Sequence, residues 1–591
     1  MKEDLSKTKK PSLKKLLVYM RPFLPALIAS VVLAVYSASV TIAGPKRIEA
    51  ITNTIMAGVV SGIDISRITQ IAMILGALFI SGSLCSYICH FILATVTQRV
   101  CYGLRADISS KINKLPLKYF DKESHGNVLS RVTNDIDNIG QALNQGVGMM
   151  VISFTLFVGA IIMMLITSPL LAVIAISTSL FGFAVMFLII TKSQKYFRAQ
   201  QSALGEVNGH VEEIYSGSST IKIYGAQDKA REKFTLANKK LWKSGWKAQF
   251  FSGMMMPVMG FIGNLGYVAV CVAGAILASS SNPAIKIEFG TIVAFLLYIR
   301  FFTQPLTQFA QGAQMLQSAS ASSERVFGFL KEEEMESETH KTETLAPESV
   351  KGFVEFSNVS FGYVENKPVI ENLSFKATPG QKIAIVGQTG AGKTTIVNLL
   401  MRFYEVLSGE ILIDGLPISS LKRETVHSLF CMVLQDSWLF EGTVKENVAY
   451  ANKEATDEEI KNACKTAGVH RFIKTLSGGY NTMLTENTAL SAGQKQLLTI
   501  ARAILTDAPM LILDEATSSV DTRTEILVQT AMDKLTAGRT SFIIAHRLST
   551  IKNADIILVL HNGGVAESGS HQELIKKNGF YSELYNSQFN I

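Results

Sequence analysis

The residues whose types and spacing most clearly predict chemistry lie between positions 382 and 394. An apolar run, Lys382-Ile383-Ala384-Ile385-Val386, leads into Gly387-Gln388-Thr389-Gly390-Ala391-Gly392-Lys393-Thr394. This is a GxxxxGK[ST] loop after a predicted strand and before a predicted helix. Glycines let successive backbone N–H groups turn inward, so a triphosphate can bind to them and to the positive end of the helix. Lys393 would neutralise the phosphates and the Thr394 hydroxyl would bind Mg²⁺, with Thr395 included in the predicted phosphate-binding set.

A second apolar run, Met510-Leu511-Ile512-Leu513, is followed directly by two adjacent carboxylates, Asp514 and Glu515. A buried strand that merely ends in a turn does not call for two acids in succession. The pair therefore predicts that Asp514 holds Mg²⁺ through water and that Glu515 polarises an attacking water.

The elements that position these residues belong to a chain of mixed composition. Its 591 residues exceed one compact core, and 48% hydrophobic with 18% charged residues suits a hybrid of membrane and soluble parts. About 20 apolar residues are needed to span a bilayer as a helix. Six segments qualify: 23–44, 68–95, 146–167, 170–190, 254–279 and 290–313.

The charge distribution predicts the orientation of these spans. The N-terminal residues 1–22 are rich in lysine, which favours a cytoplasmic N-terminus. Short turns at Ser168-Pro169 and 280–289 would then be external, and an even number of spans returns the chain to the cytosol. A signal peptide is disfavoured because the first apolar run is too long. Nucleic-acid binding is disfavoured because no aromatic stacking platform accompanies the lysines.

Two long charged stretches, 98–145 and 191–250, separate the spans. They favour helices and are too long for turns, so we expect membrane helices that continue into the cytosol. Each contains a bend, at Tyr119–Asp135 and at Ile221–Gln227. From the residues alone, either bend could be functional or merely solvated.

The remaining chain divides at an acidic segment. Residues 331–351 show no apolar periodicity and predict a linker between a domain at 23–330 and one at 352–591. Short β-rich runs alternate with helical stretches after it, which predicts an α/β domain. The expected strands are 353–356, 382–386, 410–413, 510–513, 541–545 and 556–560.

With these motifs in order, the region from about Phe353 onward resembles the ATPase domain of an ABC transporter. Leu490-Ser491-Ala492-Gly493-Gln494 is similar to the family signature apart from Ala492. A second stretch, Leu476–Gly479, is rejected because Tyr480 follows it. The resemblance implies further roles in nucleotide binding and catalysis: Tyr363 stacks on adenine, Gln435 senses Mg²⁺, Asp521 contacts the dimer partner, His546 binds the γ-phosphate, and Ser491, Ala492, Gly493 and Gln494 cap the nucleotide of a partner.

The resemblance extends to nearly the whole chain. Six helices before one ATPase domain look like a half-transporter of the ABC exporter type, with cofactors ATP and Mg²⁺ and a position in the bacterial plasma membrane. Such a chain has half of each catalytic site and implies at least a dimer. In that fold the two cytosolic bends resemble coupling helices, which would drive the membrane domain between inward and outward states.

Two departures from the family pattern bear on the partner. Ala492 stands where the family prefers glycine, and the preceding loop, residues 485–489, lacks the usual glycine. Because Lys393, Glu515 and His546 are intact, the chain resembles the catalytically competent subunit of bacterial heterodimeric multidrug-type exporters. We therefore favour a heterodimer, with a homodimer as the alternative.

The substrate is the least determined part. Met254, Met255, Met256, Phe301 and Phe302 could line an adaptable cavity or only pack in the core. Arg300 lies near the midplane of the last span, where a charge is costly. We expect export of a small amphipathic drug, lipid or peptide. An ATP-gated channel and an importer on the same scaffold are the alternatives.

Overall fold

The computed structural model describes residues 13–283, 286–364, 367–434, 437–485, 488, 490–514, 522–544 and 551–589. The chain forms two compact units. The helical unit comprises Met1–Asn113 and His125–Glu332, and the sheet unit comprises Lys114–Ser124 and Glu333–Ile591.

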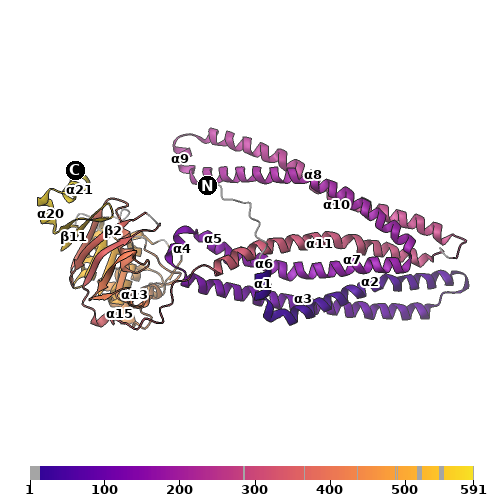
Figure 1. Cartoon of the computed structure of the whole chain (residues 1–591), viewed down its shortest axis with the longest axis horizontal. Coiled ribbons are helices and arrows are strands. Elements are labelled where there is room, and N and C mark those ends of the chain that lie inside the picture. Colours follow the sequence, from indigo (N-terminus) through magenta and orange to yellow (C-terminus); the bar gives the residue numbers. More distant parts are fainter. Residues whose placement is uncertain are drawn as a thin grey trace. The chain divides into compact units, whose positions relative to one another are not determined.

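Long helices make up the helical unit (Figure 1). They are α2 (Leu24–Ser61), α3 (Ile65–Lys114), α7 (Val147–Thr167), α8 (Pro169–Ser216), α10 (Gln227–Ala278) and α11 (Phe289–Leu330), preceded by the short α1 (Leu13–Tyr19). Within the part of the chain that the structure describes, six helical spans of 39 to 52 residues are apolar enough to cross a membrane. At about 1.5 Å per residue they measure roughly 60–80 Å, twice the hydrocarbon thickness. The prediction of six apolar helices is confirmed in length and composition, and their continuation beyond the bilayer stays a prediction that these lengths permit.

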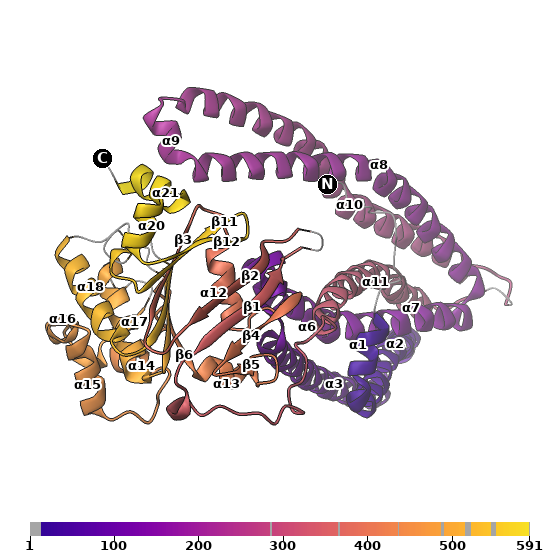
Figure 2. The ribbon, with the colours of Figure 1, turned by 60° about the vertical axis from the view of Figure 1, so that its left-hand side comes forward.

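The connections between helices follow the predicted turns. Only Ser168 separates α7 from α8, as expected from the Ser-Pro pair. Helices α8 and α10 form a hairpin whose tip is α9 (Ser218–Ile223), as Figure 2 shows. At this tip Ile223 and Tyr224 are 78% and 80% exposed. The second predicted bend is therefore a helical tip with exposed apolar side chains, and its docking on an ATPase domain stays a prediction.

The first predicted bend, Tyr119–Asp135, is not one segment. Helix α4 (Leu117–Lys122) belongs to the sheet unit, whereas α5 (His125–Ser130) and the π-helical turn Arg131–Asp135 belong to the helical unit. The Asp135 carboxylate is buried and accepts two hydrogen bonds from Arg325 of α11. Asp135 therefore anchors the helix bundle and does not lie on a docking surface.

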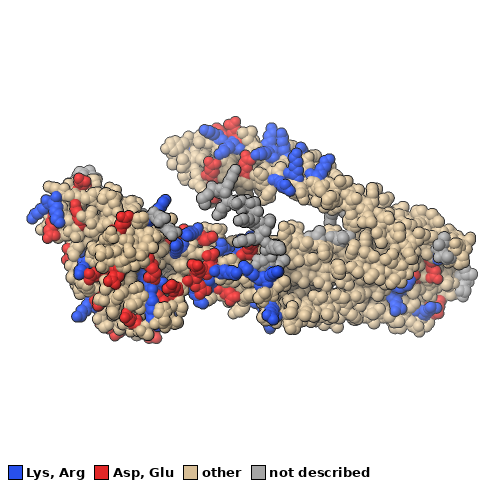
Figure 3. Space-filling model, viewed as in Figure 1, with Lys and Arg blue, Asp and Glu red and all other residues tan. Residues whose placement is uncertain are grey.

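Charge is distributed unevenly over the helical unit. On the face shown in Figure 3, Lys and Arg gather on α8 and α10 toward α9, and the stretch beyond them is almost uncharged. This pattern matches the sequence, since residues 170–190 and 254–279 contain no Lys, Arg, Asp or Glu. Such an uncharged surface suits hydrocarbon.

Two main sheets build the other unit (Figure 2). The larger has the order β12-β11-β3-β10-β9-β6, parallel except for β12, and the smaller is antiparallel with the order β2-β1-β4-β5. The strands are β1 (Val354–Phe361), β2 (Ile370–Ala377), β3 (Lys382–Gly387), β4 (Ser408–Ile413), β5 (Leu416–Pro417), β6 (Phe430–Val433), β7 (Gly442–Thr443), β8 (Met483–Leu484), β9 (Met510–Asp514), β10 (Thr540–Ile544), β11 (Ile556–His561) and β12 (Gly564–Gly569). All six predicted strands are present, and Ala545, the last residue of the predicted strand 541–545, lies outside the described residues.

Among the described residues, helices cover this unit around three buried clusters. One cluster lies between the two sheets and α12, a second joins the parallel sheet to helices of the 444–536 region, and a third joins β3 and β11 to α20 and α21. The helices are α12 (Lys393–Leu400), α13 (Arg423–Ser428), α14 (Val444–Val448), α15 (Asp457–Thr466), α16 (His470–Thr475), α17 (Ala492–Thr506), α18 (Thr522–Thr536), α20 (His571–Lys577) and α21 (Phe580–Phe589). The expected fold class, a helical membrane domain followed by an α/β domain, is confirmed.

The acidic linker is attached more firmly than its composition suggests. The Glu338 side chain is only 14% exposed and pairs with Arg402 and Arg423, each at 2.9 Å, and with Lys341 at 3.2 Å. Burial alone would raise the pKa of Glu338, but the hydrogen bonds and the two arginines hold it below its usual value. Residue 338 is thus an anchor of the linker on the sheet unit.

We predict that Glu338→Gln loosens the linker. Losing the buried charge of Glu338 weakens the attachment of the linker by about 2–3 kcal/mol and leaves the buried Arg402 with one carboxylate partner fewer. Trypsin should then cleave near Lys331 and Lys341 at least tenfold faster, because nicking follows the open population. Since the folded pKa is depressed, the anchoring is present above the unfolded value of about 4.3 and is lost as pH falls through the folded pKa.

The matched control is Glu336→Gln, which removes an exposed charge from the same linker. Equal cleavage rates for the two variants would contradict the anchoring role of Glu338.

Candidate nucleotide site

The predicted phosphate loop connects β3 to α12. Gly390 and Gly392 have φ values of +87° and +96°, a region that side chains with a Cβ rarely adopt. A Cβ on Gly387 would lie 2.7 Å from the carbonyl oxygen of Leu560, so this position also needs glycine. The loop thereby turns its backbone toward the N-terminus of α12, where anions are favoured.

Lys393 is the first residue of α12 and its side chain folds back over the loop. Its Nζ donates to the carbonyl oxygens of Gly387 and Gln388 at 2.8 and 3.0 Å. Burial lowers the pKa of Lys393, and the charge of Asp514 opposes this shift. The lysine and the carboxylate that the sequence assigned to one site are thus electrostatically coupled.

Strand register explains why Asp514 lies at the same edge of the sheet as the loop. Ile544 of β10 pairs with Ile385 of β3 on one side and with Asp514 of β9 on the other. Parallel strands place their carboxyl ends together, which is where ligands bind in open α/β sheets. Asp514 therefore ends its strand level with the start of the phosphate loop.

A cavity of about 390 Å³ lies against the loop. Its lining includes Gln388, Thr389, Gly390 and Ala391 of the loop, together with residues around the β11–β12 turn and Pro368-Val369. No sequence pattern indicated the contribution from His561 and Asn562, because only the β3–β11 pairing brings them to the loop.

Tyr363, the predicted adenine-stacking residue, lies beside α12. Its hydroxyl donates to Thr395 Oγ1 at 3.2 Å and accepts from Asn398 Nδ2 at 3.3 Å. Its ring meets those of Phe361 and Tyr404 at centroid distances of 5.0 and 5.1 Å, both nearly perpendicular. The residue is close to the phosphate loop, and its stacking on adenine stays a prediction.

Tyr404 makes a contact that no sequence motif indicated. Its hydroxyl donates to the Asp121 carboxylate of α4, within the sheet unit. Burial, and then the acceptor Asp121, raise the pKa of Tyr404, so this hydroxyl remains a donor. Helix α4, which lies between two membrane spans in the sequence, is thus hydrogen-bonded to Tyr404, and the ring of Tyr404 contacts the ring of Tyr363.

The signature segment forms the start of α17. Ser491 caps the helix: its Oγ accepts from the Gln494 N–H at 3.3 Å, and the Gln494 side chain accepts from the Ser491 N–H at 3.0 Å. Ala492 is the first helical residue and is exposed, and Gly493 is buried. The rejected stretch Leu476–Gly479 instead follows α16 and leads into a three-residue turn.

Several predicted site residues lie outside the described residues: Gln435, Glu515, Asp521 and His546. Within the described part, no group of three or more His, Cys, Asp and Glu side chains could hold a metal ion. The oxygen donors of Thr394 and Asp514 suit Mg²⁺, which in proteins commonly binds one or two carboxylates plus substrate phosphates. The donor set therefore fits Mg²⁺ held jointly with a nucleotide.

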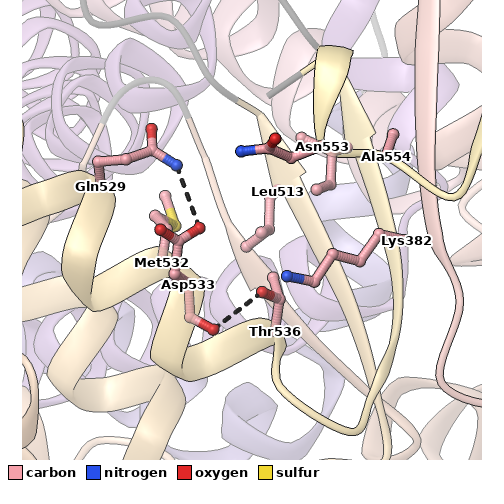
Figure 4. A pocket seen from close by; sticks show the side chains of 9 residues that line it. Lys382, Leu513, Gln529, Met532, Asp533, Thr536, Asn553 and Ala554 are labelled. Carbon is pink, nitrogen blue, oxygen red and sulfur yellow. Dashed lines mark hydrogen bonds between the residues drawn. The ribbon is translucent and has the colours of Figure 1, made fainter. Parts of the chain in front are cut away.

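A smaller cavity of about 30 Å³ lies between α18 and the parallel sheet (Figure 4). Gln529, Asp533, Asn553 and Lys382 supply its polar groups, and Gln529 donates to Asp533 at 3.3 Å. Its volume accommodates a water molecule but no nucleotide. It is separate from the phosphate loop and plays no part in the candidate site.

Comparisons with known proteins agree with this site. Residues 27–306 match the family described as ABC transporter transmembrane region, and residues 370–518 match the family described as ABC transporter. The chain is 46% identical over 524 residues to the fatty acid ABC transporter ATP-binding/permease protein of Mycobacterium bovis, covering 88% of this chain and 82% of that protein. It is 42% identical over 590 residues to YfiC of Bacillus subtilis, described as an uncharacterized ABC transporter ATP-binding protein, covering 100% and 96%.

A solved structure, that of a bacterial Atm1-family ABC exporter with ATP bound, is also similar. It has a TM-score of 0.72 at 26% identity, covering 96% of this chain and 98% of the other. The chain belongs to the ABC transporter family and carries a transmembrane domain fused to one ABC ATPase domain. It is an ATP-binding, multi-pass membrane protein of the exporter type, and exporters of this fold work as dimers.

We predict that Gly392→Ala weakens ATP binding at least tenfold. Its left-handed backbone disfavours any Cβ, and that Cβ would lie 2.6 Å from Ile370 Cδ1, displacing the first turn of α12. The measurement is equilibrium binding of ATP to the purified full chain.

Gly538→Ala is the matched control. Gly538 also has a positive φ, +76°, but a Cβ at this position would meet no atom within 4 Å. The control therefore carries the same kind of backbone strain without the clash, and its ATP affinity should stay unchanged. Wild-type affinity in Gly392→Ala would contradict the proposed geometry of the loop.

Proposed function

We propose that this protein uses ATP hydrolysis to export an amphipathic substrate across the plasma membrane by alternating access, as half of a dimer. The observation that carries the proposal is the placement of the phosphate loop and Asp514 at one sheet edge, in a chain with six membrane spans. The N-terminus and the ATPase domain would lie in the cytoplasm.

In this mechanism each residue has a defined task. The loop N–H groups and Lys393 hold the phosphates, and Glu515 orients the attacking water. Mg²⁺ bound near Thr394, Gln435 and Asp514 would neutralise charge that develops on the phosphates. Catalysis is then positioning and electrostatics, completed by Ser491 and Gly493 of the partner chain.

Coupling to the membrane would use α4 and α9. The support for α4 is its packing within the sheet unit and the hydrogen bond from Tyr404 to Asp121. The support for α9 is its exposed apolar tip at Ile223 and Tyr224. Movement of these segments with the ATPase domains would rock the membrane helices.

The alternatives are disfavoured on specific grounds. A non-pumping channel needs nucleotide binding more than turnover, and the carboxylate Glu515 argues for turnover. An importer remains the second candidate in principle, but the likeness is to an exporter structure. The relative named as a fatty acid transporter supports a lipid-like substrate for this chain.

We predict that Glu515→Gln keeps ATP binding but lowers hydrolysis at least about 100-fold, because the water loses its general base. Substrate uptake into inside-out vesicles should fall in parallel. Near-normal turnover would show that Glu515 is not the catalytic carboxylate, and transport in the opposite direction would contradict export.

We also propose a heterodimer in which the partner supplies a glycine-containing signature. Ala492 is compatible with α17, since alanine favours a helix by about 1 kcal/mol over glycine. Its added methyl group, however, would stand between the helix N-terminus and the phosphate of a nucleotide on the opposite chain. A misplaced hydrogen-bond donor can lose roughly 3 kcal/mol of transition-state stabilisation.

The resulting prediction is weak ATPase activity for the purified single chain and a strong rise on co-expression with a half-transporter that carries LSGGQ. The control is Ala492→Gly, which should raise the activity of a forced homodimer and barely affect the consensus site of a heterodimer. A purified homodimer that hydrolyses ATP and transports at full rate would contradict the heterodimer.

A further inference from the structure

Helix α11 carries a polar stripe that the nucleotide site does not explain. Its members are exposed and recur at helical spacing: Arg300, Gln304, Thr307, Gln311 and Gln314. At 100° per residue they fall within an arc of about 80°, and they extend about 21 Å along the axis. The opposite face is apolar and buried, with Phe295, Tyr298 and Phe302 in the core of the helical unit.

Arg300 is exceptional within this stripe. It is the sole Lys, Arg, Asp or Glu in the six predicted spans 23–44, 68–95, 146–167, 170–190, 254–279 and 290–313. It lies 11 residues after the start of α11, or about 16 Å, which is near the bilayer midplane. Among the described residues no carboxylate pairs with it.

An unpaired guanidinium and a row of amides are costly against hydrocarbon, so this face does not suit lipid tails. It suits an aqueous path or a partner surface. The six predicted spans contain no Asp or Glu, and Arg300 has no carboxylate partner among the described residues, so a complementary charge would come from another molecule. Arg binds carboxylates and phosphates through two parallel hydrogen bonds, which fits an acid headgroup.

We propose that the polar stripe lines the substrate path and that Arg300 binds the acid group of an anionic amphiphile. This inference rests on the proposed export function and narrows its substrate class. One turn before Arg300 on α11, Leu296 and Leu297 are half-buried and flank the polar stripe, so they provide apolar surface beside the charge. A head-and-tail molecule would place its acid at Arg300 and its tail against such apolar surface.

The experiment measures ATPase stimulation of the full transporter, with its partner if one is needed, in neutral-lipid nanodiscs. The anionic probes are oleate and lysophosphatidic acid, and the neutral probes are oleyl alcohol and monoolein. Arg300→Gln should raise the half-maximal concentration of the anionic probes at least tenfold and leave the response to neutral probes unchanged. Arg300→Lys should restore part of the anionic response, since it keeps the charge but not the two parallel bonds.

The matched control is Lys192→Gln, which removes an exposed cation just beyond the apolar part of α8 and should change neither response. The proposal would be overturned if the wild-type ATPase responded equally to anionic and neutral probes. It would also be overturned if Arg300→Gln reduced the stimulation by both classes of probe to the same extent. Dissociation of the dimer in Arg300→Gln would reassign Arg300 to the partner interface and also overturn it. Failure of the export proposal is a separate outcome, because it would appear as transport in the opposite direction, or as no transport, in inside-out vesicles of the wild type.

Discussion

The parallel register of β3, β10 and β9 is the constraint on which the ATPase domain depends. All five residues of β10 are buried, and it pairs with β3 and β9 over four and five residues. A charged side chain is costly to bury within these strands, so the charged groups of the site occur where the strands end. Because these strands are parallel, the phosphate loop and Asp514 lie at the same edge of the sheet. A register shift of one residue would move Asp514 away from the loop and turn buried side chains to the wrong face.

The same constraint explains which strands could be predicted from the sequence. Inner parallel strands are covered on both faces and form continuous apolar runs, as Lys382–Val386 and Met510–Leu513 do. Strand β2 lies at a sheet edge and buries only Ile370, Leu373 and Ala377, so its pattern is too weak to separate from a loop. Strand β12 is also at an edge, and none of its six residues is fully buried.

Side-chain partners were less predictable than strands, because they depend on residues far apart in the chain. Glu338 belongs to an acidic run that resembles a solvated linker, and nothing nearby in the sequence indicates Arg402 and Arg423. The first cytosolic bend was predicted as one docking segment, yet Asp135 pairs with Arg325 inside the helix bundle. Motifs with short spacing, such as Gly387–Thr394 and Ser491–Gln494, depend on local geometry, and both lie at the start of a helix.

The bond between Tyr404 and Asp121 joins residues 283 positions apart and has a consequence for biosynthesis. At about 5–20 residues per second, α4 leaves the ribosome roughly 15–60 s before Tyr404 is made. All six membrane spans are synthesised before the contact can form. Helix α4 must therefore wait for its partner Tyr404 until the whole membrane portion of the chain has been synthesised, so the sheet unit cannot be completed before the six spans exist.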